Sequence, residues 1–176
     1  MMKRLLLISA AFVVSLSLSL NAQEGKDNLI PDPAFKKFGY DPTKHREVWK
    51  ERWIPHQIKT PSEWKLDGGK AAVELKGGET FLHSPRYAVK PGQKFSIAVT
   101  AEGKGTLSVQ CLWWTAEGDM AQPHRTIPIE PVELKGDSQR VEGTDTAPEG
   151  ASEAYIRIVV QDGTITVSQP EVKLAK

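Results

Sequence analysis

The chain has 176 residues, with 23 Lys and Arg against 22 Asp and Glu and a formal net charge of +1 at pH 7. A balance so close to zero gives no electrostatic reason to bind nucleic acid or an anionic membrane surface. The single cysteine, Cys111, excludes an intramolecular disulfide framework, so stability must come from a packed core.

The first 22 residues show the order of features of a secretory signal peptide. Lys3 and Arg4 precede an uncharged run over 5–20, and the small residue Ala22 follows at a suitable cleavage position. The run is diluted by serines and is shorter than the roughly 20 apolar residues of a membrane span. We therefore expect cleavage after residue 22 and a secreted or periplasmic protein with no stable membrane anchor. No cysteine near the cleavage site could accept lipid.

Residues 23–176 would form the mature protein. Loss of Lys3 and Arg4 brings the formal net charge to −1. This length suits one domain with a sizeable core, and neither an internal repeat nor a low-complexity linker divides it. We therefore expect a single domain that stands alone, without an attached catalytic domain.

Short runs with period-2 alternation recur along this domain, between Gly, Pro and Asp residues. The run over 107–114 alternates most clearly, since Leu107, Val109, Cys111 and Trp113 fall on one face. The predicted strands are 71–75, 79–83, 95–100, 107–114, 140–144, 154–160, 164–168 and 172–174. Turns are predicted at 90–92, 102–103, 116–119, 148–150 and 161–163. About eight short strands predict an all-β, antiparallel sandwich or barrel.

The segment over 36–66 departs from this pattern and holds three of the five tryptophans. An Asp-Pro pair there is a helix cap followed by proline at the first helical position, so we expect a short helix over 42–53. Trp49 and Trp53 would then share one helix face. The two rings could form a second binding platform, or the segment could cover an open end of the core with its tryptophans buried. The second interpretation is favoured.

Five segments occur in a recognisable order. They are Asn28-Leu29-Ile30-Pro31-Asp32-Pro33-Ala34-Phe35-Lys36, Val89-Lys90-Pro91-Gly92-Gln93-Lys94-Phe95, Trp113-Trp114-Thr115-Ala116-Glu117-Gly118, Ala147-Pro148-Glu149-Gly150-Ala151 and Pro170-Glu171-Val172-Lys173-Leu174. Together they resemble the carbohydrate-binding modules of the family 4/9 (CenC-like) type, from about residue 28 to residue 174. The resemblance implies a jelly-roll β-sandwich of the galactose-binding-like superfold and a glycan or polysaccharide as partner.

Members of that family often hold a structural calcium where the opening and closing segments meet. Calcium needs hard oxygen ligands, chiefly carboxylates. In this chain Lys36 and Pro170 stand at two of the acidic positions. Calcium is therefore not expected, nor is any other cofactor, and Lys36 could instead form an ion pair with Glu171.

A sugar-binding surface needs an apolar platform for the pyranose ring and planar polar groups for its hydroxyls. The outward face of the strand over 107–114 offers Gln110 and Trp114, and that of the strand over 154–160 offers Tyr155 and Arg157. If both faces line the same sheet surface, these four residues form a sugar site. Alternatively, the aromatic rings cap the sandwich edge and Arg157 pairs with a surface acid.

Enzymatic activity is not expected. His45, His56, His83 and His124 show no metal-ligand spacing, and no G-x-S-x-G elbow is present. Cys111 falls on an apolar strand face, as a small buried hydrophobe does. A glycosidase needs two carboxylates flanking a cleft, and a sandwich of this size leaves little room for both.

These features predict an exported, non-catalytic protein that binds a glycan through aromatic stacking. The alternative is a cell-envelope module that uses the same fold for a structural role or to hold a protein partner. Sequence alone does not distinguish the two, because one fold of this kind carries many binding functions.

Overall fold

The computed structural model describes residues 27–39, 50–57, 63–115 and 123–175. Their strands are β1 (Ile54–Gln57), β2 (Lys65–Asp67), β3 (Lys70–His83), β4 (Tyr87–Ala88), β5 (Lys94–Thr115), β6 (His124–Thr146) and β7 (Ala151–Leu174). All pairs between them are antiparallel, which confirms the predicted all-β sandwich. The expected signal peptide over 1–22 lies outside the described residues.

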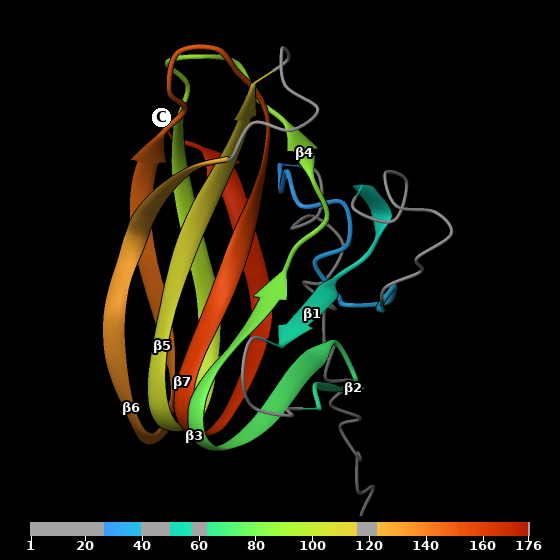
Figure 1. Ribbon diagram of the computed structural model, residues 1–176, viewed down its shortest axis with the longest axis vertical. Helices are drawn as coiled ribbons and strands as arrows, with labels where there is room; N and C mark the ends of the chain where they lie inside the picture. Colours follow the sequence, from blue (N-terminus) through green and yellow to red (C-terminus); the bar gives the residue numbers. More distant parts are fainter. Residues whose placement is uncertain (1–26, 40–49, 58–62, 116–122, 176) are drawn as a thin grey trace, which may run out of the picture.

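The strand order is β1-β3-β7-β5-β6, with β2 paired to β3 and β4 paired to β7. β5 is an interior strand, since it pairs with β6 along one side and with β7 along the other for almost its whole length. In Figure 1 these long strands run down one layer, turn at the lower end of the view and return along the other. One sheet, folded back on itself, therefore supplies both layers of the sandwich.

The fold-back explains a difference from the sequence-based strands. The predicted strands 95–100 and 107–114 are two halves of β5, and 154–160, 164–168 and 172–174 are parts of β7. The turns predicted at 102–103 and 161–163 are bends within continuous strands. At the bend Gly103 has a φ of 115° and Gly163 a φ of 88°, a conformation that L side chains rarely adopt.

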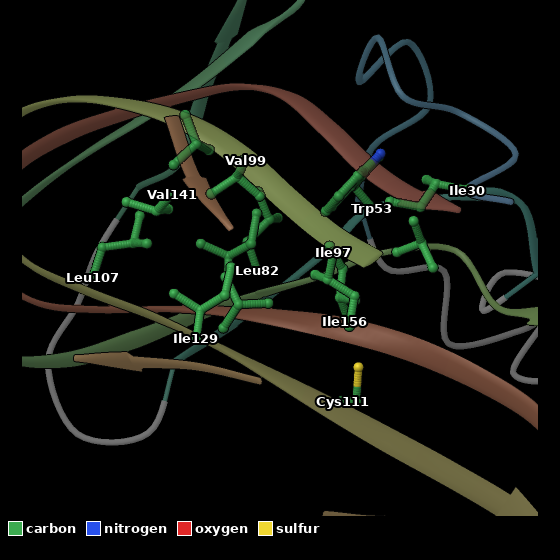
Figure 2. Packing of buried hydrophobic residues seen from close by; sticks show 14 of the residues in the cluster. Ile30, Trp53, Leu82, Ile97, Val99, Leu107, Cys111, Ile129, Val141 and Ile156 are labelled. Atoms are coloured by element: carbon green, nitrogen blue, oxygen red, sulfur yellow. The ribbon is translucent and has the colours of Figure 1, made fainter. Parts of the chain in front are cut away.

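The core lies between the two layers, where the inward residues of each half-strand meet (Figure 2). The predicted inward face of 107–114 is confirmed, because Leu107, Val109 and Cys111 are 0% exposed and Trp113 is 1% exposed. Burial raises the pKa of the Cys111 thiol, and the neighbouring Asp145 carboxylate raises it further. A buried thiol with a raised pKa is a poor nucleophile.

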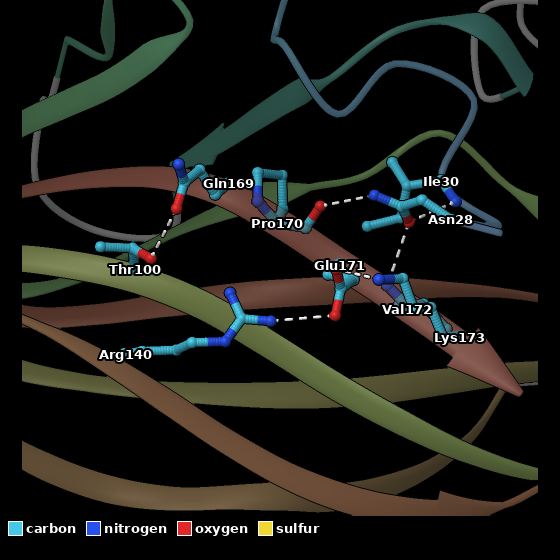
Figure 3. A network of polar contacts seen from close by, with 9 residues as sticks. All are labelled: Asn28, Ile30, Thr100, Arg140, Gln169, Pro170, Glu171, Val172 and Lys173. Atoms are coloured by element: carbon cyan, nitrogen blue, oxygen red, sulfur yellow. Dashed lines mark hydrogen bonds and ion pairs between the residues drawn. The ribbon is translucent and has the colours of Figure 1, made fainter. Parts of the chain in front are cut away.

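The opening segment is fastened to the last strand by Asn28 (Figure 3). Its Nδ2 donates to the carbonyl oxygen of Pro170 at 2.9 Å, and its Oδ1 accepts the backbone N–H of Val172 at 3.1 Å. This is the seam at which the resemblance would place a calcium. Among the described residues, no group of three or more His, Cys, Asp or Glu is placed to hold a metal.

The suggested ion pair between Lys36 and Glu171 is not present. Glu171 instead pairs with Arg140 at 2.9 Å and with Lys173 at 2.6 Å. These cations lie beside Glu171 on the outer surface of the sheet, because Arg140 stands on β6 and Lys173 follows two positions along β7.

The expected helix over 42–53 falls mostly outside the described residues. Of its described part, Lys50 and Glu51 are helical, but Trp53 forms an isolated β-bridge with Phe38. The helix therefore cannot extend to Trp53 as predicted, because this residue is tied to the opening segment. No helix within the described ranges is long and apolar enough to cross a membrane.

Candidate functional site

The outward faces of β5 and β7 bring the four predicted site residues of these strands together. The pairing register sets Gln110 opposite Arg157, Leu112 opposite Tyr155 and Trp114 opposite Glu153. The expectation that these strands share one sheet surface is therefore correct. On the other side of β7, His83 of β3 stands opposite Arg157 and extends the row.

Arg157 is the centre of this surface. Its Nε donates to Nε2 of His83 at 2.9 Å, and one terminal nitrogen donates to Oε1 of Gln110 at 3.4 Å. Its guanidinium carbon lies 4.6 Å from the centroid of the Phe81 ring. Arg157 is half-buried and forms no ion pair within the described residues, so the alternative that it pairs with a surface acid is wrong for this part of the chain.

Tyr155 supports the arginine rather than offering an open ring. It is only 3% exposed and packs against His83, with ring centroids 5.2 Å apart. Burial raises the pKa of its phenol, while the charge and hydrogen bonding of Arg157 partly oppose that shift. Its expected use as a stacking platform for a sugar is therefore corrected, because strand alternation fixes the face of a side chain but not what covers it.

Trp114 lies at the other end of the surface and is half-buried. The Arg86 guanidinium carbon lies 4.4 Å from its ring centroid, a cation–π contact. Arg86 also pairs with Glu153 at 3.3 Å, and Lys50 reaches the other oxygen of the same carboxylate at 3.3 Å. The indole N–H of Trp114 is buried and has no hydrogen-bond partner among the described residues.

The second predicted platform is not supported by the structure. Trp53 is 0% exposed, packs on Phe35 with ring centroids 4.4 Å apart, and donates its indole N–H to the carbonyl oxygen of Asp32 at 2.6 Å. It is a core residue and cannot stack on a ligand, which fits the interpretation that this segment covers the core. Trp49 lies outside the described residues.

Sequence reasoning missed three residues of this surface, namely Phe81, His83 and Arg86. The first two alternate outward along the predicted strand 79–83, so their spacing could have placed them on the same face. Arg86 follows a proline in the short connection between β3 and β4, and no pattern in the sequence indicates its contact with Trp114.

No protein-family model matches the chain, and a search of curated proteins gives no match. Solved structures do match it. A CBM4 carbohydrate-binding module superposes with a TM-score of 0.60 and 16% identity, over 83% of this chain and 99% of that one. TmCBM61 in complex with β-1,4-galactotriose superposes with a TM-score of 0.50 and 11% identity, over 84% and 99% of the two chains.

A third match is the enzymatically active domain of tailspike protein 4 from bacteriophage CBA120, with a TM-score of 0.60 and 13% identity over 85% of this chain. The chain spans only 22% of that tailspike domain. At these identities the likeness concerns architecture. The chain has the β-sandwich fold of carbohydrate-binding modules, with a polar and aromatic cluster on one outer sheet face.

Proposed function

We propose that this protein is an exported, non-catalytic carbohydrate-binding protein, and that the surface formed by Gln110, Trp114 and Arg157 contacts the glycan. The observation that carries the proposal is the convergence of these three half-buried side chains on one face of adjacent strands. The module-like fold supports it, since related sandwiches include sugar-binding modules.

The chemistry of these groups suits a saccharide. The Gln110 amide offers a donor pair beside its carbonyl, and Arg157 offers planar donors. Sugar hydroxyls both donate and accept, so they can satisfy such a mixed set. The exposed part of the Trp114 ring would pack on the C–H face of a pyranose.

Export is part of the proposal and rests on the order of features over residues 1–22. Expression of the full chain in a bacterial host, followed by N-terminal sequencing of protein from the periplasm or medium, tests it. A mature N-terminus at Gln23 is expected. Retention of Met1 in the cytoplasm would contradict it.

Binding is tested on a glycan array and by polysaccharide affinity electrophoresis. Wild-type protein should bind at least one glycan, and both Trp114→Ala and Gln110→Ala should weaken that binding at least ten-fold. Gln161→Ala is the matched control, because Gln161 lies on the same strand pair but bonds to the exposed Glu79 carboxylate at 2.7 Å. If no glycan binds and an envelope protein is recovered by cross-linking instead, the protein-interaction alternative replaces this proposal.

A further inference from the structure

We infer that the glycan carries a negatively charged group, the carboxylate of a uronic acid, and that Arg157 holds this carboxylate. The inference rests on the proposed function and specifies its ligand class. It starts from the charge of Arg157, for which the described residues supply no counter-charge.

The immediate partners of Arg157 are all neutral acceptors or rings. They are Nε2 of His83, Oε1 of Gln110, the Tyr155 phenol and the ring of Phe81. Partial removal of a cation from water costs free energy, and a well-placed anion with matching hydrogen bonds can offset that cost. A ligand anion would therefore supply the counter-charge that the described residues do not give this half-buried arginine.

The surface around Arg157 is also positively charged. Arg86 and Lys50 converge on the single carboxylate of Glu153, at 3.3 Å each. Arg125 of β6 stands opposite Leu112 and is exposed at the margin of the same face. Among the described residues, cations thus outnumber acids in the rows from Glu153 to Arg157, although the chain as a whole is close to neutral. Such a local excess attracts an acidic ligand.

The geometry favours a carboxylate attached to a sugar ring. A guanidinium presents its N–H groups in a planar fork that matches a carboxylate, and such charge-assisted pairs are stronger than neutral hydrogen bonds. Because the Nε N–H donates to His83 and one terminal N–H donates to Gln110, the remaining terminal N–H groups are those left for a ligand. Gln110, on the same face, would then contact a ring hydroxyl.

The experiment compares acidic polysaccharides with neutral ones that have the same backbone. Polygalacturonate, alginate and glucuronoxylan are each tested beside their carboxyl-reduced forms, with dextran sulfate and dextran as a further pair, by isothermal titration calorimetry. The expected result is that at least one uronan binds ten-fold or more tightly than its carboxyl-reduced form, and that this binding weakens as salt is raised.

Variants then assign the carboxylate contact to Arg157. Arg157→Gln should remove the preference for the uronan, whereas Arg140→Gln, an exposed arginine on β6, should leave it unchanged. Arg157→Lys should retain part of the preference, because it keeps the charge but not the fork. If Arg157→Gln fails to fold by circular dichroism, the comparison of native and reduced polysaccharides on the wild-type protein still decides the charge requirement.

The outcomes separate this inference from the proposed function. Equal binding to native and carboxyl-reduced polysaccharides would overturn the inference and leave glycan binding intact. Binding to dextran sulfate but to no uronan would overturn the carboxylate assignment. Binding to no saccharide at all would overturn the proposed function itself.

Discussion

Asn28 and Val172 are 144 positions apart in sequence, and the side-chain oxygen of the first accepts the backbone N–H of the second at 3.1 Å. The same oxygen accepts the N–H of Ile30 at 3.1 Å, and the amide nitrogen donates to the carbonyl oxygen of Pro170 at 2.9 Å. One amide side chain thus joins the opening segment to the end of the last strand. Its removal would leave several part-buried backbone groups without partners.

Asn28→Ala should therefore lower the free energy of unfolding by about 2 kcal/mol, since each lost bond contributes about 0.5–1.5 kcal/mol. Urea denaturation followed by tryptophan fluorescence measures this. The control is Arg140→Ala, which removes an exposed ion pair and should cost no more than about 1 kcal/mol. Equal losses in the two variants would argue against a fastening role for Asn28.

Gly103→Ala should be far more damaging than Gly136→Ala. Both glycines have similar backbone angles, with φ of 115° and 123°. A Cβ at Gly103 would lie 2.1 Å from the carbonyl oxygen of Thr164, whereas at Gly136 it would meet nothing within 4 Å. We expect about 1–3 kcal/mol of destabilisation at Gly136 from backbone strain alone, and little folded protein for Gly103→Ala. Soluble yield and thermal melting compare them.

The same contrast shows what the sequence could and could not predict. Alternation placed Leu107, Val109 and Cys111 in the core and Gln110 on the outer face, because side-chain direction in a strand has a strict period of two. A glycine between two alternating runs, however, is compatible with a turn or with a bend inside one strand. Only the pairing of Gly103 with β6 and β7 distinguishes them, and pairing is not a local property.

The candidate site was predictable to a similar extent. Register follows from alternation once two strands are neighbours, so Gln110 and Arg157 could be placed together. The burial of Tyr155 and Trp53 could not, because it depends on what packs over each ring. The contact of Arg86 with Trp114 arises from a connection without periodic signal.

Substitutions of Trp53 and Trp114 should have different effects, the first on stability and the second on glycan binding. Trp53→Phe removes the 2.6 Å hydrogen bond to Asp32 and part of the packing on Phe35, so it should destabilise the protein by about 2–4 kcal/mol. Because Trp53 is fully buried, glycan affinity of the folded variant should be unchanged. Trp114→Ala should instead weaken glycan binding and leave the stability of the protein close to that of the wild type. Loss of affinity in Trp53→Phe at a temperature where it is folded would show that Trp53 acts on the site.

The stability of the protein should fall at alkaline pH because of two buried acids in the core. Burial raises the pKa of the Cys111 thiol well above its ordinary 9.0, and burial followed by the influence of Cys111 and Asp145 raises the pKa of the Tyr87 phenol well above 10.0. Each group stays protonated in the folded state over a pH range in which the unfolded chain has lost the proton. The contribution of each group to the free energy of unfolding is therefore complete below its ordinary pKa. This contribution is lost as the pH rises towards the pKa that the group has in the folded state.

Denaturant unfolding between pH 7 and pH 11 should show this directly. The wild-type free energy of unfolding should begin to decline near pH 9, by up to about 1.4 kcal/mol per pH unit for each titrating group. Cys111→Ala should be less stable at pH 7 because of the cavity, but it should lack the decline that begins near pH 9. Tyr87→Phe should retain that early decline and lose only part of the decline that starts near pH 10, because the buried Tyr155 phenol, whose pKa is also raised, still contributes there. Parallel curves for the wild type and Cys111→Ala across this range would show that the thiol is not the group responsible.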